Sequence, residues 1–217
     1  MSTTVDQPFG GERAISTTVD QRFRKRRTDR SSAADTREHV LIVASIGFSQ
    51  MGFDHLGVRE IASDADVDPA TLIRVFGSKE ALFADVAAGA FRFEAPFKGS
   101  IRGLGRRIAT HLTGGNAEPA LDEFDGLCFL MRSATSSIAA PILAAALHKG
   151  LVKPMAEQLG GEDAQMRAAL LAACVLGFMT ARFALCSTGI VGSLDKSPAC
   201  RDRLRTRLGK ALQACVT

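Results

Sequence analysis

The segment from Asp35 to Phe83 constrains the fold of this chain most, because it places short helical patterns around tight turns. Apolar residues recur every three or four positions from Val40 to Met51, which is the spacing of one face of a helix. Asp35 and Glu38 have the spacing of a capping pair at the start of this helix, and Gly52 is the residue type that commonly ends one. The sequence therefore predicts an opening helix with one buried face.

Two shorter helices are predicted next. The first runs from about Val58 to Ala65 and ends at the turn Asp66–Val67. Asp68–Pro69 then supplies a helix cap and the residue best tolerated at the first helical position, so a third helix is expected over Pro69–Phe76. Two helices joined by a short turn and supported by a first helix are typical of helix-turn-helix DNA-binding proteins. Ordinary helical domains also contain this spacing.

The residue types in the segment resemble the N-terminal DNA-binding domain of the TetR family of bacterial transcriptional regulators. The matching residues are Thr36–Arg37, Gly52–Phe53, Val58–Ala62, Val67, Thr71–Leu72, Phe76 and Ser78–Leu82. The resemblance implies an all-α fold, with an N-terminal three-helix helix-turn-helix head and a helical C-terminal body for ligand binding and dimerisation. It implies a homodimeric regulator, and we expect a repressor that a small apolar ligand releases from a near-palindromic operator in double-stranded DNA.

The resemblance also implies which residues contact DNA. Arg59, Thr71 and Lys79 match family contact positions, and the third helix is expected to enter the major groove. The full expected set in the head is Arg59, Pro69, Ala70, Thr71, Ile73, Arg74 and Lys79.

Three positions depart from the family pattern. Asp66 stands where a turn Gly is usual, and Asp can adopt the required left-handed conformation at modest cost. Ile73 and Val75 stand where the family usually has Tyr and His, so two polar contacts to the DNA backbone are absent. Two interpretations of Ile73 and Val75 remain open: Ile73 contacts a thymine methyl group, or both side chains pack inward.

A basic arm precedes the head. Residues 22–30 carry six basic side chains against one acidic, a net charge of +5, whereas the whole chain has a formal charge of +4. We expect Arg24, Lys25, Arg26 and Arg27 to follow DNA phosphates or enter the minor groove. A solvated basic tail is the alternative. Residues 2–7 recur as residues 16–21, and neither copy has an apolar face, so we expect this region to be disordered. The expected domains are a disordered arm at 1–34, the head at 35–83 and the body at 84–217.

The rest of the chain has helical periodicity. Helices are predicted at about Lys79–Phe93, Ile101–Leu112, Pro119–Ser136, Ala140–Leu159, Asp163–Ser187 and Ser197–Cys215. The helix from Asp163 is apolar over much of its circumference, which suits a position between its own core and a second subunit. The resemblance implies a homodimer through the last two helices, although a monomer that buries this helix is the alternative.

Apolar residues of the body form a candidate ligand site. The set is Phe91, Phe97, Leu104, Ile108, Phe124, Leu127, Cys128, Met131 and Leu147, and each of them is also compatible with plain core packing.

Other classes of protein have little support in the sequence. The four histidines have no metal-binding spacing, and no nucleophile motif appears. No phosphate-binding Gly-rich loop follows a predicted strand either, so we expect no enzyme and no cofactor. The five cysteines fit reduced thiols in the cytoplasm, and Cys128 or Cys186 would sense oxidants only if exposed and acidic. The chain has no run of about 20 apolar residues that would span a bilayer. The competing hypothesis is a helical binding or interaction protein with a degenerate head.

Overall fold

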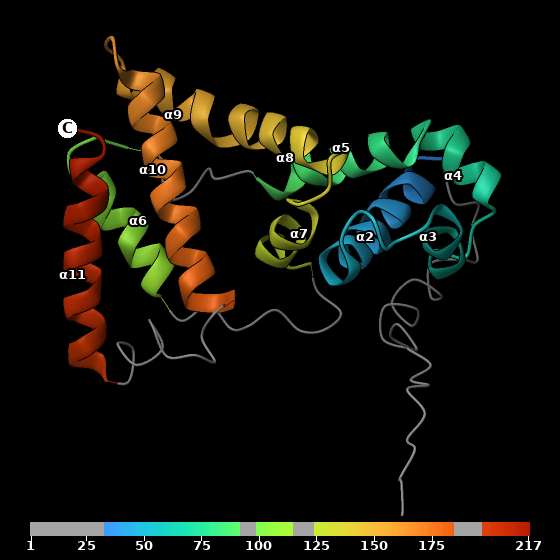
Figure 1. Ribbon diagram of the computed structural model, residues 1–217, viewed down its shortest axis with the longest axis horizontal. Coiled ribbons are helices and arrows are strands. Elements are labelled where there is room, and N and C mark those ends of the chain that lie inside the picture. Colours follow the sequence, from blue (N-terminus) through green and yellow to red (C-terminus); the bar gives the residue numbers. More distant parts are fainter. Residues whose placement is uncertain (1–32, 92–98, 115–123, 185–196) are drawn as a thin grey trace, which may run out of the picture.

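The computed structural model describes residues 33–91, 99–114, 124–184 and 197–217, and all regular structure in these ranges is helical (Figure 1). The molecule is elongated. The helices of the head lie at one end, and α6, α10 and α11 lie at the other (Figure 1). The all-α fold expected from the sequence is thus confirmed for the described part of the chain.

The head contains the helices that the apolar pattern predicts. They are α2 (Ala33–Met51), α3 (Val58–Asp64), α4 (Pro69–Phe76) and α5 (Lys79–Ala90). The expected cap at Asp35 is wrong, because α2 already begins at Ala33 and Asp35 lies in its first turn. An acidic side chain there still favours the helix, since the first turn carries the positive end of the helix dipole.

Local capping fixes the turns around α4. The carboxylate of Asp68 accepts a hydrogen bond from the backbone N–H of Ala70 at 2.7 Å, and the Ser78 hydroxyl accepts from the N–H of Ala81 at 3.1 Å. Asp66 has φ of +52°, so it adopts the left-handed conformation expected at the position of the usual Gly. The helix-turn-helix geometry therefore survives this departure from the family pattern.

The body also follows the predicted order of helices. Its elements are α6 (Leu104–Thr113), α7 (Gly126–Ser133), α8 (Ala139–Leu147), η1 (His148–Val152), α9 (Lys153–Leu159), α10 (Ala164–Met179), η2 (Thr180–Ala184) and α11 (Pro198–Ala214). The helix expected over Ala140–Leu159 is continuous but passes through the π-helical segment η1. Leu104 begins α6 three residues later than expected, because Gly103 precedes it in the left-handed region at φ of 85°.

Two hydrophobic cores hold these helices together. The first joins α2–α5 to α7 and α8, and Phe129 of α7 is fully buried in it beside Phe48 and Phe83. The second joins α6, η1, α9, α10 and α11. Apolar contact is therefore continuous from the helix-turn-helix into α7 and α8, past the expected domain boundary at residue 83. That boundary remains a prediction.

The contact between α6 and α11 requires small residues. A Cβ atom on Gly105 would lie 2.3 Å from the carbonyl oxygen of Gly209, closer than real Cβ contacts allow. The amide oxygen of Gln213 accepts hydrogen bonds from the backbone N–H groups of Gly103 and Gly105 at 3.1 and 3.2 Å. Close approach and these bonds make α6 and α11 one packed pair.

One helical segment corrects an expectation. Ala164–Arg182 has a mean hydropathy of 1.5 in its best window and is long and apolar enough to cross a bilayer, whereas the sequence suggested no such segment. The mean hydropathy of the window stays high because most of its residues are apolar, although the segment contains Arg167. Core helices of helical bundles meet the same criterion. Only 28% of the window is buried within this chain, so much of its apolar surface is open.

Candidate nucleic-acid interface

The third helix of the head, α4, has one buried and one exposed face. Leu72 and Phe76 are buried, whereas Pro69, Ala70 and Arg74 are exposed and Thr71 is half-buried. The side chain of Ile73 is 41% exposed and points away from the core. Val75 instead packs against the first core. The interpretation in which both side chains pack inward is therefore wrong for Ile73, which is exposed, and holds for Val75, which packs against the core.

Arg59 and Arg74 are the basic side chains that the head leaves available. Both are exposed, and no partner for either is found among the described residues. Lys79 is different, because its Nζ lies 4.3 Å above the centre of the Phe53 ring. Burial lowers the pKa of Lys79, while Asp54, Glu80 and Glu60 act in the opposite direction. Lys79 is therefore partly engaged within the head.

Arg37 connects three helices of the head. Its guanidinium lies 2.6 Å from the carboxylate of Asp85 in α5 and 5.2 Å from the ring centre of Phe76 in α4. The ion pair is half-exposed, so its contribution to stability is small. Its geometric role is to set α4 against α2 and α5. The sequence matched Arg37 to the family without giving it this role.

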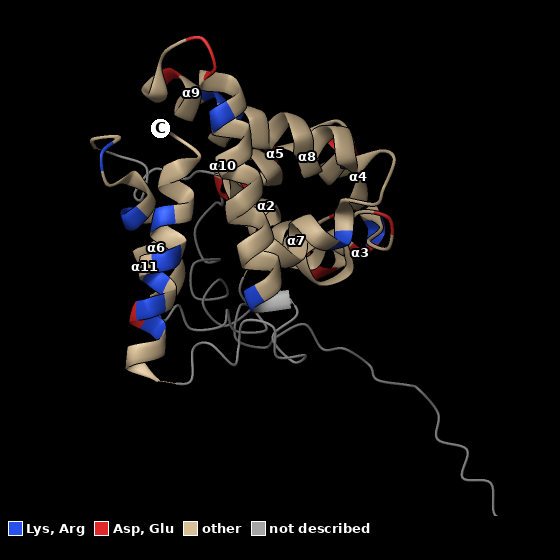
Figure 2. Cartoon of the chain, turned by 60° about the vertical axis from the view of Figure 1, so that its left-hand side comes forward, with Lys and Arg blue, Asp and Glu red and all other residues tan. Residues whose placement is uncertain are grey.

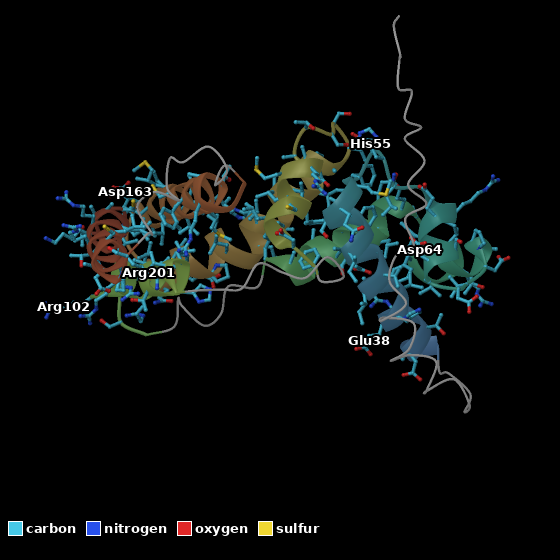
Figure 3. The ribbon with its side chains drawn as sticks, turned by 90° about the horizontal axis from the view of Figure 1, so that it is seen from below. Glu38, His55, Asp64, Arg102, Asp163 and Arg201 are labelled. Atoms are coloured by element: carbon cyan, nitrogen blue, oxygen red, sulfur yellow. The ribbon has the colours of Figure 1, made fainter. Side chains whose placement is uncertain are left out.

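The head is acidic without the arm. Residues 35–83 carry eight acidic and four basic side chains, a net charge of −4, which is opposite in sign to the +5 charge of residues 22–30. Figure 3 labels Asp64 and Glu38 at this end of the molecule. Burial and the neighbouring Glu60 raise the pKa of Asp64. The expected phosphate contacts Arg24, Lys25, Arg26 and Arg27 lie outside the described residues.

Hydrogen bonds join the turn between α2 and α3 to the end of α7. We call this contact the head–body joint and define it by residues 49–54 on one side and 132–136 on the other. Arg132 donates to the carbonyls of Ser49, at 3.0 Å, and of Gln50. The buried hydroxyl of Ser133 accepts from the backbone N–H of Phe53 at 3.1 Å.

Further contacts close the same joint. The hydroxyl of Ser136 donates to the carboxylate of Asp54 at 2.8 Å. Gly52 has φ of +76°, and a Cβ atom on it would lie 2.7 Å from the carbonyl oxygen of Arg132. Gly52 is thus required for two reasons: its positive φ ends α2, and its lack of a side chain permits the close contact with Arg132. Sequence periodicity alone missed Arg132, Ser133 and Ser136, since their partners lie about eighty positions away.

The expected ligand residues are divided between the two cores. Phe91, Phe124 and Leu147 belong to the first core or border it, whereas Leu104 and Ile108 are buried in the second. Leu127 is buried, Cys128 is half-buried and Met131 is 44% exposed, while Phe97 lies outside the described residues. The position of a ligand site therefore stays a prediction. Among the described residues, no group of three or more His, Cys, Asp or Glu side chains has metal-binding geometry.

Helices α3 and α4 and the turn between them have the helix-turn-helix arrangement that is typical of DNA-binding transcriptional regulators. A model for the N-terminal domain of bacterial regulatory proteins of the tetR family matches residues 43–86, and one for the Tetracyclin repressor-like C-terminal domain matches residues 103–216. The second match alone covers more than half of the 217 residues. The chain belongs to the TetR family of DNA-binding transcriptional regulators, which are not enzymes.

Solved structures agree with this assignment. A TetR-family regulator from Streptomyces coelicolor A3 is 29% identical, with a TM-score of 0.54 over 83% of this chain and 94% of that one. A putative TetR-family regulator from Rhodococcus sp. is 18% identical, with a TM-score of 0.59 over 85% and 100%. Salmonella enterica GusR is 21% identical, with a TM-score of 0.54 over 82% and 95%. The last two support the fold alone, and the search of curated proteins finds no match.

Proposed function

We propose that this chain is a homodimeric repressor that binds a near-palindromic operator and is released when a small apolar ligand binds the body. The observation that carries the proposal is the head–body joint, because it ties the position of the DNA-binding helices to α7. The proposal includes a cytoplasmic location and the division into arm (1–34), head (35–83) and body (84–217).

Each protomer inserts α4 into the major groove. Thr71 and Arg74 reach base edges or phosphates, Arg59 contacts the flanking backbone, and Ile73 contacts a thymine methyl group. The two-fold axis sets the two α4 helices about 34–36 Å apart, one turn of DNA. The exposure of Ile73 and Arg74 supports this assignment of contacts.

The arm supplies most of the affinity. A head with a net charge of −4, with Arg59 and Arg74 already counted, is repelled by DNA phosphates. The +5 charge of residues 22–30 brings the net charge of these residues and the head together to +1, and their basic side chains release counterions from the duplex when they bind phosphates. We therefore assign affinity to the arm and sequence choice to α4.

The dimer forms through α10 and α11. Met166 and Leu170 are 64% and 52% exposed on α10, and Ala173 and Gly177 continue the same exposed apolar stripe. A Cβ atom on Gly177 would meet nothing within 4 Å, so this side of the helix is open to a second copy. An isologous two-fold contact covers the stripe in both protomers at once.

Ligand release follows from a shift between two states. A ligand that binds the body better in one state displaces α5 and α7 and changes the spacing of the two heads. Couplings of this kind are typically about 1–3 kcal/mol, a factor of about 5–150 in affinity, and they are reciprocal. Arg132 and Ser133 of the joint transmit the displacement to the turn before α3.

The test is a DNA-binding titration of the full chain with the DNA upstream of its own gene. Fluorescence anisotropy is measured at several salt concentrations for the full chain and for a variant that lacks residues 1–30. We expect specific binding by the full chain, and a weaker and less salt-dependent affinity in the deletion. An unchanged salt slope contradicts the role of the arm. Absence of specific binding to the upstream DNA and to a randomised DNA library contradicts the repressor and favours an interaction protein.

A further inference from the structure

Two thiols from different helices meet beside the open stripe of α10. The Sγ atoms of Cys174, in α10, and Cys215, which follows the last residue of α11, are 3.8 Å apart. Cys174 is exposed and Cys215 is half-buried. The cysteines are 41 positions apart in the sequence, so no motif announces the pair.

We propose that Cys174 and Cys215 form a two-thiol site that a hydroperoxide converts into an intramolecular disulfide. The Cys174 thiolate attacks the hydroperoxide, the O–O bond breaks, and the alcohol leaves with a proton. Cys174 becomes a sulfenic acid. The Cys215 sulfur then attacks Cys174 Sγ, the S–O bond breaks, and water leaves. Two thiols are oxidised by two electrons, and one hydroperoxide is reduced to an alcohol and water.

The backbone around the pair is held in place. Arg167 of α10 donates to the carbonyl of Val216 at 3.0 Å and to the carbonyl of Gly160 at 2.5 Å. Leu212 and Val216 are 1% and 2% exposed and anchor the end of α11 in the second core. A disulfide requires the sulfurs to approach from 3.8 Å to about 2.05 Å, so both side chains must rotate while the helix contact is kept.

The roles of the two sulfurs differ. Within one protomer Cys174 is exposed and Cys215 is half-buried, so a small oxidant reaches Cys174 more readily than Cys215. Cys215 donates to the carbonyl of Ala211 at 3.4 Å, and burial followed by its hydrogen bond with Cys174 raises the pKa of Cys215. Cys174 therefore reacts first, and Cys215 resolves the sulfenic acid.

Cys128 and Cys200, the other two cysteines that the structure describes, lack this arrangement. Hydrogen bonds from Ser197 and Arg203 lower the pKa of Cys200, but the described residues place no second thiol beside it. Burial raises the pKa of Cys128, which argues against it as an oxidant sensor. Cys186 lies outside the described residues. Proximity rather than acidity thus singles out the pair.

Peptide mapping tests the proposal directly. Trypsin cleaves after Lys and Arg, so each of the five cysteines falls in its own peptide; Cys174 lies in residues 168–182 and Cys215 in residues 211–217. The reduced full chain is treated with cumene hydroperoxide, alkylated, digested and analysed by mass spectrometry without reduction. We expect the 168–182 and 211–217 peptides joined with loss of two hydrogens. Non-reducing electrophoresis is expected to leave the protein at the mass of one chain.

Two variants complete the test. Cys215→Ser is expected to abolish the cross-link and to leave Cys174 as a sulfenic acid that dimedone traps. The matched control Cys200→Ser is expected to form the cross-link as the wild type does. Oxidation is expected to raise the Tm of the wild type and of Cys200→Ser by several degrees, and not that of Cys215→Ser. A link between two chains, a link to another cysteine, or free alkylatable thiols at both positions overturns the proposal.

Discussion

The ring of Phe83 in α5 lies 4.8 Å from the ring of Phe129 in α7. Phe83 ends the segment whose sequence resembles a DNA-binding head, whereas Phe129 comes from the expected body. Both side chains are fully buried. The helix-turn-helix therefore shares its core with α7, and a displacement of α7 cannot leave the head untouched, because packed cores transmit strain.

Phe129→Ala tests this shared core. The substitution removes a fully buried ring that also lies near Phe48 and Phe124, and we expect a loss of about 3–5 kcal/mol in the free energy of unfolding. Urea unfolding followed by circular dichroism measures it. The matched control Ile138→Ala removes a side chain that is 50% exposed and is expected to change stability by less than about 0.5 kcal/mol. Similar losses in both variants contradict a shared core.

Ser133→Ala tests the head–body joint. The variant leaves the backbone N–H of Phe53 buried without its acceptor, and we expect a loss of about 1–3 kcal/mol in the free energy of unfolding. Ser137→Ala, at an exposed serine four positions on, is the control and is expected to be neutral. Amide hydrogen exchange at Phe53 gives a local check. Unchanged protection in Ser133→Ala would show that this hydrogen bond contributes nothing to the joint.

The turn before α4 allows a comparison of two variants. Asp66 has φ of +52°, a conformation that Gly adopts without cost and Ala does not. Both Asp66→Gly and Asp66→Ala remove the carboxylate, so their difference reports the backbone alone. We expect Asp66→Gly to be more stable than Asp66→Ala by about 1 kcal/mol in thermal unfolding. Equal stability would mean that the turn is not strained.

The carboxyl of Asp64 predicts a pH dependence. Burial, and then Glu60, raise its pKa in the folded state. A raised folded-state pKa means that the stabilisation is present below the unfolded pKa of about 3.9 and is lost as the pH rises through the folded value. Asp64→Asn is therefore expected to be more stable than the wild type at neutral pH, with the difference vanishing toward about pH 4. A variant that is less stable than the wild type at neutral pH contradicts the shift.

Arg74→Ala tests the DNA-facing surface of α4. The exposed guanidinium has no partner among the described residues, so its removal is expected to leave stability unchanged. Operator affinity is expected to fall by about 1–3 kcal/mol if Arg74 contacts a base. Arg207→Ala is the matched control, because Arg207 is exposed on α11 in the body, where basic side chains also gather (Figure 2). Equal effects of the two variants on affinity would contradict a contact at α4.

Helix positions could largely be predicted from the sequence, because caps and turns are local. The ends of α4 lie where the sequence predicted them, with Asp68 as the N-cap, Pro69 as the first residue and Gly77 as the C-cap. Capping and the fixed φ of proline act within a few residues, so they can be read from the sequence. The expected cap at Asp35 was wrong, because Asp35 lies inside the first turn of α2, where an acidic side chain is also favourable. The basic arm and the departures at Ile73 and Val75 were also evident from residue types alone.

Long-range relationships required the tertiary structure. Whether Ile73 or Val75 faces outward depends on how α4 is rotated against α2 and α5, and the pairing of Arg132 with the end of α2 depends on where α7 docks. The same is true of Cys174 and Cys215. The sequence alone determined the family, the approximate positions of the helices, and the net charges of the arm and the head. Each of these depends on residue type and on spacing over a few positions. Only the packing of distant helices decided the head–body joint, the division of the expected ligand residues between two cores, and the thiol pair.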